Sequence, residues 1–407
     1  MNRREFIKKS AAYAAYTAFG MTTPATFKGV AVARKQPDMI VEDDLLQALE
    51  ASDVARASEQ LRKKLSKGEE AWEIHLSLFP VVQRVLNPPF INPHLPKMYG
   101  IYRELVPYLR KNEIPALIHL EVTEYAKRPK LKELPKAKLL NSSVSFSDVE
   151  TAIGDQDWEK TAVLMATFHA QEGGVELARR LLLLGSGYLD GSLGHSISCT
   201  TFILLEMLER DDQDPWPGLA TLADYFCKGR FNTTPALWKS KAFPSDEALN
   251  HHLLRATSGS GIVNLHHTIT RYAVERARQF FSKEEYNHMV EAWIAFMEDK
   301  KAERIALDSP GLDPAADYPR FYETFSRLDA KSTVAIAAGM IGSQEGRRRL
   351  GRFLIKGLCD QYQGNYNPHY LTGLGSALWV MDRYWNQESI VLKALFQYLS
   401  FFFDGIK

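Results

Sequence analysis

The spacing of apolar residues is the feature that most restricts the fold of this chain. In seven stretches they recur three and four residues apart, which is the pattern of a helix with one buried face. Alternating valine-rich segments are nearly absent, and the Asp190-Gly191 pair lies between two helical patterns rather than in a hairpin. The sequence therefore predicts an all-α fold, either a multi-helix bundle or an array of stacked helix pairs. The stretches cover residues 45–61, 149–168, 175–184, 200–208, 269–281, 286–297 and 371–384.

The first 33 residues have the features of a twin-arginine (Tat) export signal. The segment Asn2-Arg3-Arg4-Glu5-Phe6-Ile7-Lys8 fits the consensus, and a mildly apolar stretch at 11–21 leads to the small-x-small motif Ala31-Val32-Ala33. That stretch is about half of the ~20 residues that a membrane span requires. We therefore expect export by the Tat translocase, cleavage after Ala33, and a periplasmic or secreted mature protein. Residues 34–407 are expected to form one large helical domain without stable membrane insertion.

Charge and cysteine content exclude several classes of protein. Residues 1–33 carry five Lys/Arg and one Glu, so the whole-chain net charge of +1 leaves about −3 on the mature chain, and no nucleic-acid partner is expected. The three cysteines, Cys199, Cys227 and Cys359, are far apart and include no C-x-x-C pair. This pattern fits neither a disulfide framework nor a zinc ribbon, and it leaves a single bridge open.

A weak internal repeat links aspartates to histidines. Asp53, Asp155 and Asp329 precede His94, His195 and His369 by 41, 40 and 40 residues, and each histidine follows a Gly- or Pro-containing break. A shorter copy leads from Ser245-Asp246 to His266-His267. Repeats of about 40 residues are typical of stacked helix pairs. The predicted repeat units are 45–125, 148–210, 245–300 and 325–390.

These repeats single out four histidines as candidate metal ligands. His94, His195, His267 (or its neighbour His266) and His369 occupy matching places, whereas His75, His119, His169 and His288 do not. If equivalent histidines begin equivalent helices, all four can point to a common centre. Neutral imidazoles from four helices could then enclose one Fe, Cu or Zn ion.

Other catalytic motifs are missing. A ferritin-like di-iron site needs two Glu-x-x-His motifs, and the chain has one, at 285–288. It contains no H-E-x-x-H, G-x-S-x-G, Walker loop or post-strand G-x-G-x-x-G motif.

Three short motifs resemble those of the questin oxidase-like family. Gly191-Ser192-Leu193-Gly194-His195-Ser196-Ile197 is similar to its Gly-x-x-His-Pro-Leu-Ile, and Leu265-His266-His267-Thr268-Ile269-Thr270 to its Leu-His-x-x-Thr. Asn367-Pro368-His369-Tyr370-Leu371-Thr372 is similar to its Asp-x-His-x-x-Lys, and the order of the motifs is kept from about residue 45 to 390.

The resemblance implies an all-helical oxygenase that holds one non-haem iron through four histidines and a carboxylated lysine, and that oxidises aromatic polyketide rings. Thr372 stands at the lysine position, and a hydroxyl does not take up carbon dioxide as an amine does. Either the fifth ligand is missing or the metal is held differently.

The leading hypothesis is a periplasmic iron-dependent oxygenase or related oxidoreductase that acts on a small aromatic or hydrophobic molecule. The expected ligands of the single ion, Fe(II) with Cu or Zn as alternatives, are His94, His195, His267 and His369. Tyr370 and Thr372 are the candidate residues behind these ligands. Two alternatives stay open: a non-catalytic helical-repeat protein that binds a ligand or partner, its histidines bonding to backbone at helix starts, and a haem or organic-cofactor protein.

Overall fold

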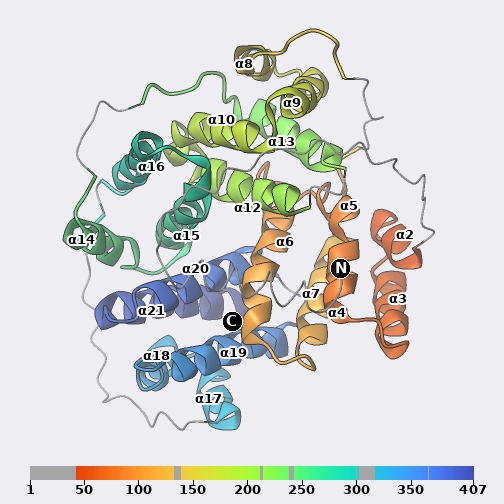
Figure 1. The fold of residues 1–407 in the computed structure, drawn as a ribbon. Helices are drawn as coiled ribbons and strands as arrows, with labels where there is room; N and C mark the ends of the chain where they lie inside the picture. Colours follow the sequence, from red (N-terminus) through yellow and green to blue (C-terminus); the bar gives the residue numbers. More distant parts are fainter. Residues whose placement is uncertain are drawn as a thin grey trace. The chain divides into compact units, whose positions relative to one another are not determined.

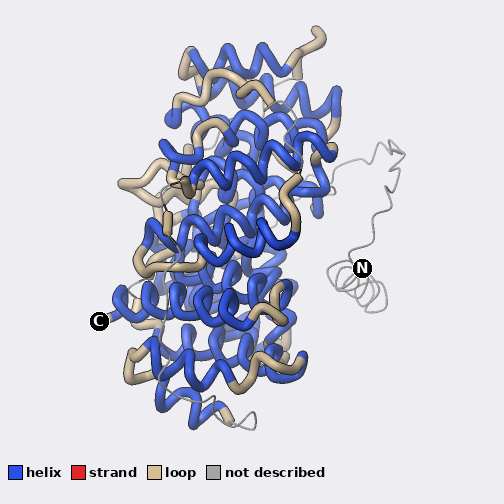
Figure 2. The backbone as a smooth tube through the Cα atoms, turned by 90° about the vertical axis from the view of Figure 1, so that its left-hand side faces the viewer, coloured by secondary structure: helices blue, strands red, loops and turns tan. Residues whose placement is uncertain are grey.

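The structure, a computed structural model, describes residues 43–407 apart from 133–138, 211–213, 238–242, 299, 302–316 and 365. The described residues belong to one compact unit, Asp43–Lys407, and residues 1–42 are assigned to a separate unit. The proposed export signal belongs to that separate unit and lies outside the described residues. Within them the all-α prediction is confirmed, with twenty α-helices and no strand (Figure 2).

The helices are numbered as in Figure 1. The first part of the chain forms α2 (Asp44–Glu50), α3 (Val54–Ser66), α4 (Ala71–Ser77), α5 (Phe79–Val82), α6 (His94–Leu105), α7 (Ile114–Lys127), α8 (Phe146–Gly154), α9 (Trp158–Glu172), α10 (Gly174–Ser186) and α11 (Leu189–Ser192). The remainder forms α12 (His195–Glu209), α13 (Trp216–Gly229), α14 (Asp246–Ala256), α15 (Ile262–Ala277), α16 (Lys283–Phe296), α17 (Tyr318–Phe325), α18 (Ala330–Ala338), α19 (Gln344–Gln361), α20 (His369–Arg383) and α21 (Glu388–Ile406). Short 3₁₀ turns follow α6 (Val106–Tyr108) and α15 (Arg278–Phe280).

Three pairs of consecutive helices are joined by the same kind of turn: α2–α3, α8–α9 and α17–α18. In each, the residue before the second helix's N-cap has a positive φ, and the N-cap aspartate accepts a hydrogen bond from a backbone N–H inside the helix, which stabilises the helix start. The positive-φ residues are Ser52, Gln156 and Leu328, and the caps are Asp53, Asp157 and Asp329. The aspartate that matches the others in the second copy is therefore Asp157, two residues beyond Asp155.

The centre of the Asp43–Lys407 unit is a closed ring of four helices. Each of α6, α12, α15 and α20 packs against two of the others, in the order α6, α12, α15, α20 and back to α6 (Figure 1). Glycines allow two of these contacts to be close. A Cβ at Gly100 of α6 would lie 2.9 Å from the Phe202 carbonyl oxygen of α12, and one at Gly373 of α20 would lie 2.9 Å from Leu265 of α15.

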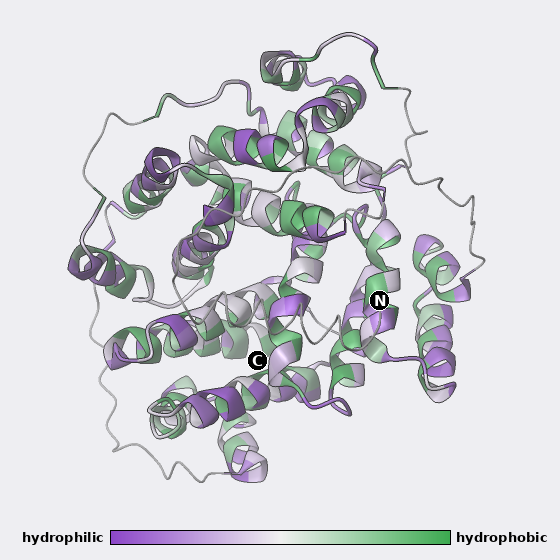
Figure 3. Cartoon of the chain, viewed as in Figure 1, coloured by the Kyte–Doolittle hydropathy of each residue, from purple (hydrophilic) through white to green (hydrophobic). Residues whose placement is uncertain are grey.

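Several of the remaining helices pack directly on this ring and cover its outer surface. α10 and α13 pack on α12, α19 and α21 on α20, and α14 and α16 on α15. Figure 3 shows the mixture of apolar and polar residues on the outer helices that is expected where one face is buried. Almost every residue of α12 and α20 is buried, so the ring lies inside the protein.

The C-terminal helix α21 is long and apolar enough, by length and composition, to cross a membrane. Half of its apolar window is buried against the protein, where it packs on α18 and α20, so its composition is explained by the core. The three cysteines are free thiols.

Candidate metal centre

Four histidine side chains from the four helices of the ring meet at one point. His94, His195 and His369 are the first residues of α6, α12 and α20, and His266 lies in the second turn of α15. The Nε2 atom of His195 lies 2.7 Å from that of His94, 3.1 Å from that of His266 and 3.4 Å from that of His369. The Nε2 atoms of His266 and His369 are 3.0 Å apart. We call these four residues the His cluster.

The opposite ring nitrogen of three members is fixed by an oxygen acceptor. Nδ1 of His195 lies 2.7 Å from the Ser192 carbonyl oxygen, and Nδ1 of His266 lies 2.7 Å from the Ile262 carbonyl oxygen. Nδ1 of His369 lies 2.7 Å from the side-chain oxygen of Asn367. An oxygen acceptor requires Nδ1 to carry the proton, so in a neutral ring Nε2 carries the lone pair.

His94 is held less specifically. Its Nδ1 lies 3.2 Å from the side-chain nitrogen of Asn87. The Asn92 backbone carbonyl is also a hydrogen-bond partner, which opposes the larger lowering of the pKa of His94 by burial and by Lys97.

The four rings are neutral at pH 7. Burial, followed by the positive charge of neighbouring groups, lowers the pKa of His94, His195 and His369 well below the ordinary value. Burial and Lys97 lower the pKa of His266 to about 3. A proton is therefore a poor bridge between the Nε2 atoms, and the lone pairs of His195, His266 and His369 face one another. Such an arrangement repels itself unless a cation lies between the nitrogens.

The geometry fits a metal ion. Imidazole nitrogens bind zinc at 2.0–2.1 Å, so neighbouring ligands lie about 3.0 Å apart in octahedral and about 3.4 Å apart in tetrahedral geometry. The spacings within the triangle of His195, His266 and His369 fall in this range. His94, His195 and His369 also form a buried group whose ligand nitrogens all lie within 4.8 Å of one another. This buried set could hold a metal ion, and hydrogen bonds from Nδ1 to oxygen acceptors are the usual way in which metal-ligating histidines are oriented.

Of the two neighbouring histidines on α15, the structure places His266 in the cluster and His267 outside it. The His267 ring lies edge-on to Phe296, with centroids 4.7 Å apart, and its backbone carbonyl accepts a hydrogen bond from Trp293. Successive residues of a helix point about 100° apart, so only one of the pair can face the centre. The sequence predicted His267 as the ligand, with His266 as the alternative, and it is the alternative that lies in the cluster.

Tyr370 and Thr372 lie close to the cluster in sequence but are not shown to contact it. The Tyr370 ring packs against Phe401 and Phe402, with centroids 5.8 and 4.9 Å away. Thr372 is completely buried, and its hydroxyl has no hydrogen-bond partner among the described residues.

The sequence predicted no role for three residues that support the cluster, Asn367, Lys97 and Ser198. Asn367 accepts from both Nδ1 and the backbone N–H of His369. Lys97, one turn after His94, is completely buried, and its Nζ lies 3.1 Å from the Ser198 hydroxyl, one turn after His195. The sequence does contain a signal for Lys97: it follows His94 by three residues, which places both side chains on the same face of a helix.

The geometry bears on the two alternatives to a simple metal site. In a non-catalytic repeat protein, hydrogen bonds to backbone oxygens at helix starts would account for the position of Nδ1 in His195 and His266. They do not account for the position of Nε2, which in each of these residues faces another histidine. Nε2 atoms separated by 2.7–3.4 Å also leave no space between them for a porphyrin.

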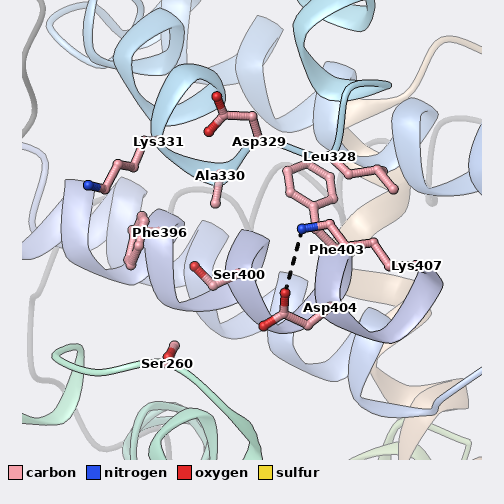
Figure 4. Close-up of a pocket in the computed structure, with 10 residues that line it drawn as sticks. All are labelled: Ser260, Leu328, Asp329, Ala330, Lys331, Phe396, Ser400, Phe403, Asp404 and Lys407. Atoms are coloured by element: carbon pink, nitrogen blue, oxygen red, sulfur yellow. Dashed lines mark ion pairs between the residues drawn. The ribbon is translucent and has the colours of Figure 1, made fainter.

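A surface hollow of about 400 Å³ lies elsewhere, between α18, α21 and the segment before α15 (Figure 4). Its lining includes Lys331, Phe396 and Phe403, and Asp404 pairs with Lys407 at 3.9 Å. None of the residues that line it belongs to the His cluster. The convergence of ligands is therefore the stronger indication of function.

Comparisons with known proteins return no relative. No family model matches the chain, and no curated protein or solved structure matches it significantly. The assignment of function therefore depends on the chemistry of the His cluster.

Proposed function

We propose that this protein holds a single metal ion, Fe(II) in the first instance, through His94, His195, His266 and His369, and uses it as a non-haem oxidoreductase. The observation that carries the proposal is the triangle of unprotonated Nε2 atoms of His195, His266 and His369, 3.0–3.4 Å apart inside the protein. Neutral imidazoles suit Fe, Cu and Zn. A bound iron would supply redox and dioxygen chemistry to the site.

The chain's own residues would hold the ion, exclude water and orient a small aromatic or hydrophobic substrate. All four ligands are buried. Two aromatic rings flank them: Phe90 lies edge-on to His94, with centroids 6.0 Å apart, and Phe401 lies edge-on to His369 at 6.2 Å. Phe90 is 61% exposed, so it offers an apolar surface to a molecule that approaches from solvent.

The resemblance to the questin oxidase-like family supports an oxygenase as the specific activity. It places the equivalent histidines in the same order along an all-helical chain. The Tat-type sequence at Arg3-Arg4 supports a periplasmic location, because that route exports folded proteins with their metal already enclosed. Replacing Arg3-Arg4 by Lys-Lys should leave the protein in the cytoplasm, and unchanged export would refute the proposed route.

Metal analysis of the untagged mature protein tests the proposed site. We expect about one equivalent of metal after anaerobic, iron-replete expression, with sharp losses in the His195→Ala and His369→Ala variants. The matched control is His288→Ala, a buried histidine outside the cluster, which should keep its metal. Folded wild-type protein without stoichiometric iron, copper or zinc would refute the proposal.

A further inference from the structure

The charges around the His cluster do not balance once a metal is bound. Four neutral imidazoles leave the charge of a divalent ion unchanged. Burial lowers the pKa of Lys97, and in its protonated form this buried group adds another positive charge. The charge of Lys97 acts on all four histidines. No Asp or Glu among the described residues contributes to the pKa of Lys97, His266 or His369.

The helix ends add positive potential of the same sign. The N-termini of α6, α12, α15 and α20 lie at the cluster, and each carries a partial charge of roughly +0.5 from its backbone dipole. None of these four helices has an acidic residue in its first turn or a side-chain cap from its N-cap residue. Nine others are capped by Asp or Ser. Among the described helices α5, α7 and α13 also lack both features, but only α6, α12, α15 and α20 carry the residues of the His cluster near their N-termini.

The Lys97 ammonium uses only part of its hydrogen-bonding capacity among the described residues. Its Nζ makes one hydrogen bond, to the Ser198 hydroxyl, and within the described part of the chain it has no ion pair. A completely buried ammonium without a counter-ion is costly. The same negative group could balance the metal, the lysine and the helix ends.

We propose that the metal's remaining coordination position is reserved for an organic anion with an oxygen donor, a carboxylate in the simplest case, whose apolar part lies against Phe90. This inference rests on the proposed metal site and narrows the substrate to molecules that carry such a group. Lys97 is a positioning residue in this scheme: it acts on the anion through its charge. With the ammonium about one to two helical turns from the anion, its field strengthens anion binding by about tenfold or more.

The test uses Co(II)-loaded full-length mature protein, with benzoate and the isosteric but neutral benzamide as probes. Binding is followed by the visible cobalt spectrum and by calorimetry at fixed ionic strength. Benzoate should bind at least about tenfold more tightly than benzamide. This comparison needs no variant, so it remains valid if substitutions at position 97 prevent folding.

Variants separate the charge from the apolar contact. Lys97→Met should weaken benzoate binding about tenfold, with benzamide binding and cobalt content unchanged. Phe90→Ala should weaken the binding of benzoate but not that of azide, an anion without an apolar ring. The matched control is Lys393→Met, because Lys393 is another buried lysine that donates to a serine, Ser258 at 2.9 Å, and this variant should bind benzoate as the wild type does.

Two results overturn the inference while leaving the metal site intact: equal affinity for benzoate and benzamide, or unchanged benzoate affinity in fully loaded Lys97→Met. A wild-type protein that takes up no cobalt, zinc or iron overturns the proposed function and this inference together. The metal stoichiometry therefore tells the two failures apart.

Discussion

The neighbouring residues His266 and His267 allow a sharp test of the metal centre. Both are buried histidines of α15, and truncating either to alanine removes the same side-chain atoms. The His266 ring faces the Nε2 atoms of His195 and His369, whereas the His267 ring faces Phe296. Metal should therefore stabilise the His267→Ala variant as it does the wild type, and should stabilise His266→Ala much less.

The size of this effect follows from linkage. A metal present at about 1,000 times its dissociation constant stabilises the folded state by about 4 kcal/mol. The entropy of unfolding is about 2.1 cal/mol/K per residue. For the Asp43–Lys407 unit, about 365 residues, it amounts to about 0.8 kcal/mol/K, so saturation should raise the melting temperature by about 5 °C.

The assay is differential scanning calorimetry of each protein with saturating metal and with excess chelator. Subtracting the chelated melting temperature removes the packing loss that either substitution causes. We expect a difference of about 5 °C for wild type and His267→Ala, and less than half of that for His266→Ala. Equal metal-dependent shifts in the two variants would refute the assignment of His266 as a ligand.

Three further predictions follow from the same contacts. Burial and nearby charges lower the pKa of His94, His195 and His369, and lower that of His266 to about 3, so below about pH 6.5 the unfolded chain binds more protons than the folded one. The stability of the chelated protein should thus be fully present above that pH and be lost as pH falls towards 3; urea midpoints that stay constant from pH 7 to 4 would contradict this. Asn367→Ala removes the acceptor that orients His369 and should weaken metal affinity about 10- to 100-fold in a chelator competition. The control Asn264→Ala, which loses only a bond to the Ser260 carbonyl, should not change it. Burial raises the pKa of Glu121 and lowers that of its partner His75, 2.9 Å away, so the pair is a hydrogen bond between neutral groups; in urea unfolding Glu121→Gln should cost less than about 1 kcal/mol and Glu121→Ala about 2 kcal/mol or more, and equal losses would show that the carboxyl group is charged.

Helical periodicity predicted the fold class because a repeated apolar face leaves few alternatives for a chain without strand patterns. The repeat also brought out His94, His195 and His369, which begin α6, α12 and α20. These three histidines could be found from the sequence because each directly follows a Gly- or Pro-containing break, after which a helix begins. Their side chains meet because the N-termini of those helices converge.

Two parts of the site could not be predicted from the sequence. The choice between His266 and His267 depends on the rotation of α15 within the ring, which is set by packing such as the close contact of Leu265 with Gly373. The significance of Lys97 depends on its complete burial beside α12 and on the fact that no described carboxylate contributes to its pKa. Neither property is a function of local sequence.

The four proposed ligands are widely separated along the chain, and this affects the order of folding and metal binding during synthesis. His94, His195, His266 and His369 are separated by 101, 71 and 103 residues, so no short fragment contains two of them. A chain that ends before α20 lacks the fourth imidazole and one side of the helix ring. If the His cluster binds a metal as we propose, the complete site forms only after nearly the whole polypeptide has been synthesised and packed. A bound ion would then mark a molecule that has completed folding.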